Sequence, residues 1–202
     1  MQRKRHVEIL HQNKDFAVVI KPVGLDAEKE CPEALKAQLS GEIYPLHRLD
    51  KNVGGVMVYA RNKQTAAALS RCIQEGCMIK EYVAIVHGTP EKEGTLEDLL
   101  YKDPRKNKVF VVNRKRNGVK EARLSYQVLK TEKENSLVQV RLFTGRTHQI
   151  RVQFASRGFP LLGDHKYGAR DDEKTPQLFS FRISFPWKGE TLVFSALPDW
   201  AK

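Results

Sequence analysis

The chain has 202 residues and a mass of 23.1 kDa, and 41% of its residues are hydrophobic, which is enough to build the core of one large domain. Lysine and arginine outnumber aspartate and glutamate by 35 to 24, and the formal charge of +11 favours a polyanionic partner such as nucleic acid. No apolar stretch is long enough to span a bilayer, no apolar block resembles a secretory signal, and Cys31, Cys72 and Cys77 show no metal-ligand spacing, so we expect a cytoplasmic protein without membrane or metal.

The N-terminal part of the chain alternates short apolar runs with polar turns. Residues 7–10 and 16–20 are apolar runs around the polar segment 11–15, which predicts two strands joined by a turn. After a less regular stretch, Gly54 to Ala60 is a run of small and β-branched residues. This run predicts a buried strand, with Asp50 in the loop before it.

A helix and a strand are expected next. Asn62 is a candidate cap for a helix whose apolar residues recur at helical spacing as far as a stop at Gly76. Residues 81–87 then include three β-branched side chains, which predicts a strand carrying Tyr82 near its start.

The second half of the chain is dominated by strand patterns. Residues 109–112 and 122–129 predict two strands flanking 113–118, which is a hairpin with a charged tip. A strand over 137–143 precedes a glycine turn and a short helix. Strand patterns return in the last part, which runs through Leu178 to Phe185, a turn at Pro186-Trp187-Lys188-Gly189 and Thr191 to Phe194.

These elements predict the α+β class, because strands outnumber helices and do not alternate with them regularly. No repeat, low-complexity tract or linker divides the chain. We therefore expect a single domain over residues 1–202, with a mixed, mostly antiparallel sheet.

Three segments carry side chains suited to chemistry. The first is His47-Arg48-Leu49-Asp50, where a loop aspartate before a buried strand suits a nucleophile or base, although capping a turn is the commoner use of such an aspartate. The second is Gly145 to Arg151, where His148 and Arg151 share a polar helix face and Ile150 belongs to the apolar one. The third is Lys80-Glu81-Tyr82, which offers an aromatic face and a phenol.

Together these segments resemble the RluA-type pseudouridine synthase family in residue type, order and spacing. His47-Arg48-Leu49-Asp50 resembles its catalytic loop, Lys80-Glu81-Tyr82 its tyrosine motif and Gly145-Arg146-Thr147-His148-Gln149-Ile150-Arg151 its basic motif. Lys21-Pro22-Val23-Gly24 and Leu162-Gly163-Asp164 resemble further landmarks, so the resemblance covers residues 7–197. The chain departs from the family at Val53 and Gly54, where threonine and serine are usual, and this departure bears on the rigidity of the loop.

The resemblance implies an isomerase that converts uridine to pseudouridine in structured tRNA or rRNA without a cofactor. It implies a pseudouridine-synthase-like domain with helices and loops around a central cleft. Asp50 would be the essential carboxylate, Arg151 its ion-pair partner and Tyr82 the stacking and proton-accepting residue. Ile150 would form an apolar wall, and Arg48 would enter the stack that the flipped base leaves. The remaining motif residues are assigned to substrate binding, namely His47, Arg146 and His148.

A run of nine positive charges between residues 102 and 123 suggests an RNA-gripping arm. Its alternative is a solvated hairpin tip. Three charges at the expected tip, Arg114, Lys115 and Arg116, are assigned to phosphate contact.

Two other functions compete with this hypothesis. A non-catalytic RNA-binding module is suggested by Val53 and Gly54, although such a module has no need of Asp50, Tyr82 and Arg151. A metal-dependent hydrolase using His148, Asp164 and His165 is disfavoured because these residues lack a recognised ligand spacing. We expect a monomer without a separate N-terminal RNA-binding domain.

Overall fold

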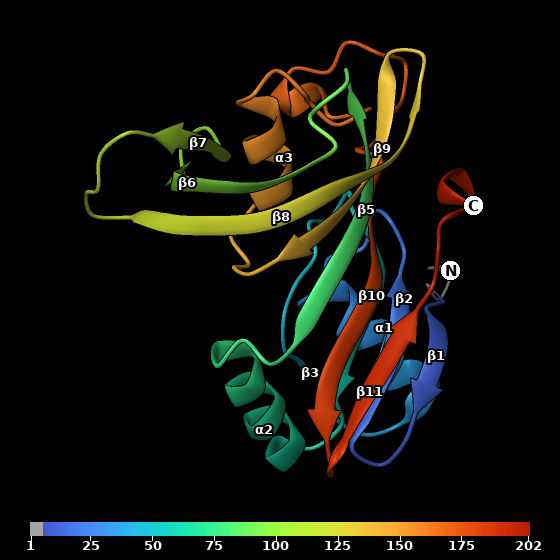
Figure 1. The fold of residues 1–202 in the computed structure, drawn as a ribbon. Coiled ribbons are helices and arrows are strands. Elements are labelled where there is room, and N and C mark those ends of the chain that lie inside the picture. The colour runs from blue at the N-terminus through green and yellow to red at the C-terminus, as the bar shows by residue number, and fades with distance from the viewer. Residues whose placement is uncertain (1–5) are drawn as a thin grey trace. The chain divides into compact units, whose positions relative to one another are not determined.

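The computed structural model describes residues 6–202 and divides into two compact units (Figure 1). Unit 1 comprises residues 6–80, 179–200 and 202, and unit 2 comprises residues 81–178 and 201. Strands outnumber helices in both units, which confirms the α+β class. The single catalytic domain stays a prediction, and residues 1–5 lie outside the described part of the chain.

Unit 1 is a mixed sheet with two helices. In sheet order its strands are β1 (Glu8–Gln12), β2 (Phe16–Lys21), β4 (Gly54–Ala60), β10 (Leu178–Trp187) and β11 (Glu190–Ser195), with β3 (Tyr44–Pro45) beside β4. The β4–β10 pair is parallel and the other pairs are antiparallel. The helices are α1 (Glu30–Leu39) and α2 (Lys63–Gln74), drawn in blue and blue-green in Figure 1.

Both faces of β2 and β4 are buried because each strand carries apolar side chains at successive positions. One face contributes Val18 and Val58 to a core cluster that includes Leu69 of α2 and Phe185 of β10. On the other face, the Tyr59 hydroxyl donates a hydrogen bond of 2.9 Å to the Ala27 carbonyl, just before α1. Continuous apolar runs are typical of strands that are covered on both sides.

Several predicted elements of unit 1 are confirmed. The β1–β2 turn is closed by Asn13, whose side-chain oxygen accepts the amides of Asp15 and Phe16 at 2.8 Å each. The α2 cap is Asn62, which accepts the Thr65 amide at 2.8 Å. Helix α1 was not predicted, because few of its side chains are buried and they form no clear apolar pattern.

Unit 2 is built on a second set of strands. Their order in the sheet is β5 (Ile79–His87), β9 (Asn135–Leu142), β8 (Val119–Glu132), β6 (Glu93–Asp103) and β7 (Lys108–Val112). Helix α3 (Gln149–Ala155) packs on this sheet, where Val152 joins a core cluster with Leu100 and Val109, and a short 3₁₀ turn, η1, spans His165–Tyr167.

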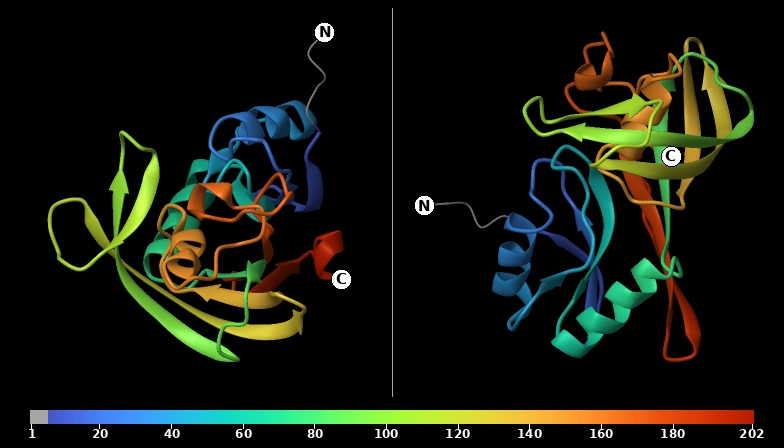
Figure 2. Two further views of the ribbon diagram at one scale, coloured as in Figure 1. Left: turned by 90° about the horizontal axis from the view of Figure 1, so that it is seen from above. Right: turned by 90° about the vertical axis from the view of Figure 1, so that its left-hand side faces the viewer.

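The predicted hairpin between residues 109–112 and 122–129 is wrong. Strand β6, which the sequence analysis did not anticipate, pairs with both segments, so Leu99 lies opposite Val112 of β7 and opposite Glu121 of β8. The two-stranded hairpin is β6–β7, closed by Asp103 and Lys108, and the connection 113–118 passes from one side of β6 to the other (Figure 2). Strand β6 was missed because its acidic and apolar residues do not alternate.

Among residues 6–202, none of the helices has the length and apolar character needed to cross a membrane.

Candidate functional site

The Asp50 loop of unit 1 is fixed by backbone hydrogen bonds. The Val53 amide donates to the Asp50 carbonyl at 2.9 Å, and the Gly24 amide donates to the Lys51 carbonyl at 2.8 Å. Asp50 itself is half-buried. The carboxylate is thus attached to a constrained turn that leads directly into β4.

The buried side chain of Lys21 supports this loop. Its Nζ donates to the carbonyls of Pro22 and Leu25 at 2.9 Å each and to that of Lys51 at 3.4 Å. Burial lowers the pKa of Lys21 to about 8, an effect that nearby acidic groups partly offset. Three carbonyls around one buried amine tie Lys21-Pro22-Val23-Gly24 to the loop of Asp50.

Val53 and the two glycines that follow it are closely packed. Val53 is only 2% exposed, so apolar packing replaces a hydroxyl at this position. A Cβ on Gly54 would lie 3.3 Å from the Lys21 carbonyl and 3.4 Å from the Phe179 ring. At Gly55, with φ +135°, a Cβ would come within 2.5 Å of the Ser180 backbone, so only glycine fits there.

The two residues that open the predicted motif differ in their surroundings. His47 Nε2 accepts the Val58 amide at 3.3 Å, which continues the β3–β4 pairing, and burial lowers the pKa of His47 to about 3. The imidazole is therefore neutral at physiological pH. Arg48 is half-exposed and lies 3.5 Å from a Glu28 carboxylate oxygen.

In unit 2, Arg151 is held by a buried carboxylate. Its Nε and Nη2 donate to the two oxygens of Asp164 at 2.7 Å and 2.8 Å, and the side chains are 6% and 1% exposed. A bidentate pair fixes the plane of a guanidinium as well as its position. From the sequence, Asp164 was identified only as part of a family landmark and of a disfavoured metal site, and its pairing with Arg151 was not predicted.

Tyr167 joins Arg151 to His148 and to β7. Its hydroxyl oxygen accepts the Val109 amide at 2.9 Å and lies 2.8 Å from His148 Nδ1, and the Arg151 guanidinium lies 5.2 Å from its ring centroid. Sequence reasoning missed Tyr167, although its place three residues after the Leu162-Gly163-Asp164 landmark was a usable signal. His148 and Arg151 are grouped as predicted, but His148 precedes α3 in a left-handed conformation instead of lying within it.

Removing the Tyr167 hydroxyl is expected to destabilise the protein by about 1–3 kcal/mol, because Tyr167→Phe leaves the buried Val109 amide without its acceptor. Urea unfolding monitored by circular dichroism measures this change. Tyr101→Phe is the matched control, since the Tyr101 hydroxyl has no hydrogen bond to any side chain or backbone group of residues 6–202, and it should unfold like the wild type. Equal stabilities of the two variants would contradict the role of the Tyr167 hydroxyl.

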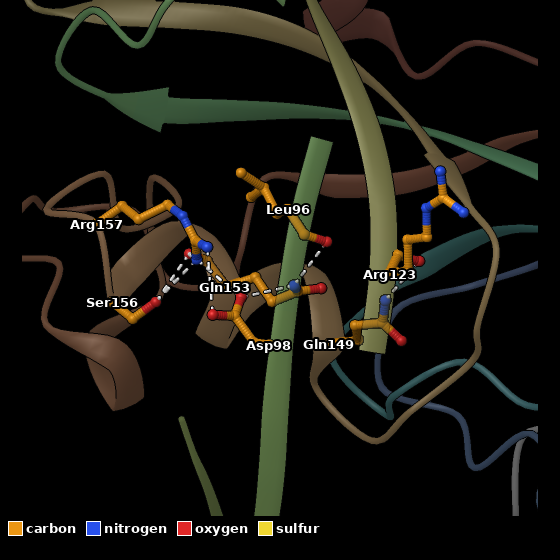
Figure 3. Close-up of polar contacts among 7 residues, drawn as sticks. All are labelled: Leu96, Asp98, Arg123, Gln149, Gln153, Ser156 and Arg157. Atoms are coloured by element: carbon orange, nitrogen blue, oxygen red, sulfur yellow. Dashed lines mark hydrogen bonds and ion pairs between the residues drawn. The ribbon is translucent and has the colours of Figure 1, made fainter. Parts of the chain in front are cut away.

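Helix α3 is not a solvated helix, since residues 149–154 are all buried. Figure 3 shows how polar side chains hold it: Gln153 donates to Asp98 at 2.7 Å, and Arg157 donates to the same carboxylate at 2.8 Å. Gln149 donates to the Arg123 carbonyl at 3.1 Å and accepts the Arg146 amide at 3.0 Å. These bonds fix the helix that carries Arg151.

The other assigned residues of unit 2 fall into a buried and an exposed group. Tyr82 and Ile150 are 5% and 4% exposed. Arg146 is exposed, and its Nε donates to the Glu121 carbonyl at 2.9 Å. Arg114 is exposed as well.

The charges of the connection 113–118 are partly engaged. Lys115 forms an ion pair with Glu121, and the Arg116 guanidinium lies 4.6 Å from the ring centroid of Tyr101. The predicted tip residues therefore lie on the connection that crosses β6.

The side chains of the metal-hydrolase alternative have different partners. Asp164 pairs with Arg151, His148 contacts Tyr167, and His165 Nε2 lies 2.8 Å from the Glu173 carbonyl. Within residues 6–202, no group of three or more His, Cys, Asp or Glu side chains is arranged to hold a metal ion.

Comparisons with known proteins converge on one family. Residues 8–156 match the family model described as RNA pseudouridylate synthase. An uncharacterized RNA pseudouridine synthase of Aquifex aeolicus is 35% identical over 93% of this chain and 68% of its own length. Ribosomal large subunit pseudouridine synthase D of Vibrio cholerae is 30% identical over 96% of this chain and 68% of its own length. The solved structure of human RNA pseudouridylate synthase domain containing 1 has the same fold, with a TM-score of 0.85 at 23% identity over 98% of this chain and 86% of that one.

Proposed function

Because this chain belongs to the RNA pseudouridylate synthase family and is therefore an isomerase acting on RNA, we propose that it converts a specific uridine of structured tRNA or rRNA to pseudouridine, with Asp50 as the essential carboxylate. The Vibrio cholerae relative is named for the large ribosomal subunit, which supports rRNA as one of the two substrate classes. The protein is proposed to act in the cytoplasm as a monomer, without metal or cofactor.

The observation that carries the proposal is the support around Asp50. Buried Lys21, the Gly24 amide and the Val53 amide hold the loop through its backbone, and a half-buried carboxylate projects from it. A loop aspartate that served only as a turn cap would not need a buried cation beneath the turn. Preorganisation of this kind is typical of catalytic groups.

The proposed reaction breaks the bond between N1 and C1′ of the uridine and forms the bond between C5 and C1′. Asp50 acts as a nucleophile or as a base toward the ribose. Arg151, whose guanidinium is held by Asp164, is the proposed ion-pair partner of the Asp50 carboxylate. Tyr82 stacks on the uracil and accepts the proton that leaves C5, while N1 gains a proton, so that the product is an isomer of the substrate.

Base flipping is part of the proposal, because a stacked uridine is out of reach of a side chain. Arg48 would fill the vacated stack with its planar guanidinium. Its present ion pair with Glu28, at 3.5 Å with both side chains about half exposed, is of a kind that contributes little free energy. This pair can therefore be exchanged for a contact with RNA at small cost. His47, Ile150, Arg146 and His148 remain proposed substrate contacts.

The purified protein tests the activity directly. RNA transcripts carrying tritium at C5 of uridine release tritium to water when pseudouridine forms, and the proposal expects release from a tRNA or rRNA stem-loop. Added chelator should leave the rate unchanged. Binding of RNA without tritium release from any candidate would instead support the non-catalytic RNA-binding module.

Charge removal from the connection 113–118 is expected to weaken RNA binding. Changing Arg114, Lys115 and Arg116 together to glutamine should make the fall of log K with log salt less steep. The magnitude of the slope should decrease by about 2–3, because up to three phosphate contacts are lost. The matched control changes Lys130, Lys133 and Lys188 to glutamine, which removes equal charge elsewhere in the chain. A slope that changes equally in both variants would exclude a specific arm.

A further inference from the structure

Phe143, directly after β9, is an unusually placed aromatic residue. It is 47% exposed, yet its ring centroid lies 4.9 Å from the Arg123 guanidinium and 5.5 Å from that of Arg141. Single exposed apolar side chains are common on protein surfaces. An exposed ring with arginines close by is a feature that nucleic-acid-binding surfaces use to stack bases.

The backbone around Phe143 is fixed to β8. The amides of Phe143 and Thr144 donate to the Arg123 carbonyl at 3.1 Å and 3.3 Å, and the Thr144 hydroxyl oxygen accepts the Arg123 amide at 2.8 Å. Thr144 also donates to buried Gln149 at 2.8 Å. The ring is therefore presented from a rigid support, which limits the entropy lost when a ligand stacks on it.

An open pocket of about 610 Å³ lies beside the ring, within unit 2. Val111, Val112 and Leu99 give it apolar lining, and Phe143 and Arg123 form part of its wall. This volume falls within the range of small-ligand sites. Among the described residues that line the pocket, neither Tyr82 nor Arg151 is present, so the pocket is separate from these two proposed catalytic residues.

The charges in the pocket favour a neutral group over a phosphate. Its three acidic residues are each paired with a cation, Glu97 with Arg123 at 3.0 Å, Asp98 with Arg157 at 2.8 Å and Glu121 with Lys115. Carboxylates can also accept hydrogen bonds from the amino groups of bases. Exposed Arg141 and Arg146 lie near Phe143 and Glu121 respectively, where they can meet the backbone phosphates of a strand whose base enters the pocket.

We propose that Phe143 and this pocket form a second nucleotide subsite, which takes one unpaired base of the RNA other than the uridine that is isomerised. The inference rests on the proposed function, because it assumes that RNA is the partner. The subsite gives the enzyme a contact with an extruded or single-stranded base of a stem-loop, and this contact contributes to the choice of RNA.

A short oligoadenylate that contains one 2-aminopurine tests the subsite apart from catalysis, since it holds no uridine. Stacking on Phe143 should quench the fluorescence of the probe. Phe143→Ala should weaken binding by about 5- to 150-fold, as expected for the loss of one base–aromatic stack, whereas Phe143→Tyr should bind like the wild type. Leu129→Ala, which truncates another exposed apolar residue of unit 2, is the matched control and should change nothing.

The salt dependence separates stacking from phosphate contact. Phe143→Ala should keep the wild-type slope of log K against log salt, whereas Arg141→Gln with Arg146→Gln should make that slope less steep. Binding by Phe143→Ala within twofold of the wild type, at an unchanged melting temperature, would overturn the subsite. The Asp50→Asn protein should bind the probe normally. Wild-type protein that binds the probe through Phe143 but isomerises no candidate RNA would refute the proposed function and leave the subsite standing.

Discussion

Replacing Asp50 with asparagine is expected to abolish the isomerisation of uridine and to leave RNA binding largely intact. Asparagine keeps the shape of the side chain but can act neither as nucleophile nor as base, and the loss of such a group lowers rates by about 10²–10⁴-fold. Tritium release from C5-labelled RNA measures the rate, and a filter-binding assay measures affinity. The loop should stay folded, because the amides of Val53 and Gly24 and the side chain of Lys21 still hold it.

The same substitution separates catalysis from turn capping. Asparagine caps turns as well as aspartate does, so an Asp50 that only capped a turn would tolerate the change. Asp103→Asn is the built-in control, because Asp103 accepts the amides of Arg105 and Lys106 at 2.9 Å and 3.1 Å in the β6–β7 turn. Both variants are expected to fold, and only Asp50→Asn to lose turnover. Equal activity in the two variants would show that Asp50 has only a structural role.

Testing Asp50→Asn in cells identifies the RNA substrate. Pseudouridines in total tRNA and rRNA are mapped by chemical labelling after deletion of the gene and after its restoration. A position that disappears on deletion and returns with wild-type protein but not with Asp50→Asn establishes both the target and the carboxylate. Persistence of every pseudouridine, together with inactive purified protein, would favour the non-catalytic RNA-binding module.

Removing the carboxylate of Asp164 is expected to cost about 3–5 kcal/mol of folding free energy, because Asp164→Ala leaves the Arg151 guanidinium buried without its bidentate partner. Activity should fall further than the loss of folded protein explains, since Arg151 loses its fixed orientation. Urea unfolding and tritium release, measured on the same preparation, give the two effects separately. Glu132→Ala, which breaks an ion pair with Lys130 whose side chains are both about two-thirds exposed, is the control and should cost less.

A double substitution distinguishes support of the fold from support of the reaction. Arg151→Met with Asp164→Leu replaces the buried ion pair by apolar side chains of similar size, and such replacements are often neutral or stabilising. Stability should therefore return while isomerisation stays lost. Recovery of activity in the double variant would remove Arg151 from the proposed mechanism, whatever the stability of Asp164→Ala.

Local patterns in the sequence determined much of unit 1. The apolar runs of β2 and β4, the Asn62 cap of α2 and the turn at Asn13 were predictable, because each depends on residues close together in the chain. The motifs that carry Asp50, Tyr82 and Arg151 were readable for the same reason, since residue type and order along the chain define them.

Tertiary structure decided which of these pieces meet. Strand β6 separates β7 from β8, and the pairing partner of a strand depends on non-local hydrogen bonds that no short pattern encodes. Asp164 and Tyr167, which follow Arg151 by 13 and 16 residues, contact it only after α3 and η1 have packed together. The sequence alone thus determined the family and the candidate chemistry, whereas the partner of Arg151 and the pocket beside Phe143 depend on packing between residues distant in the chain.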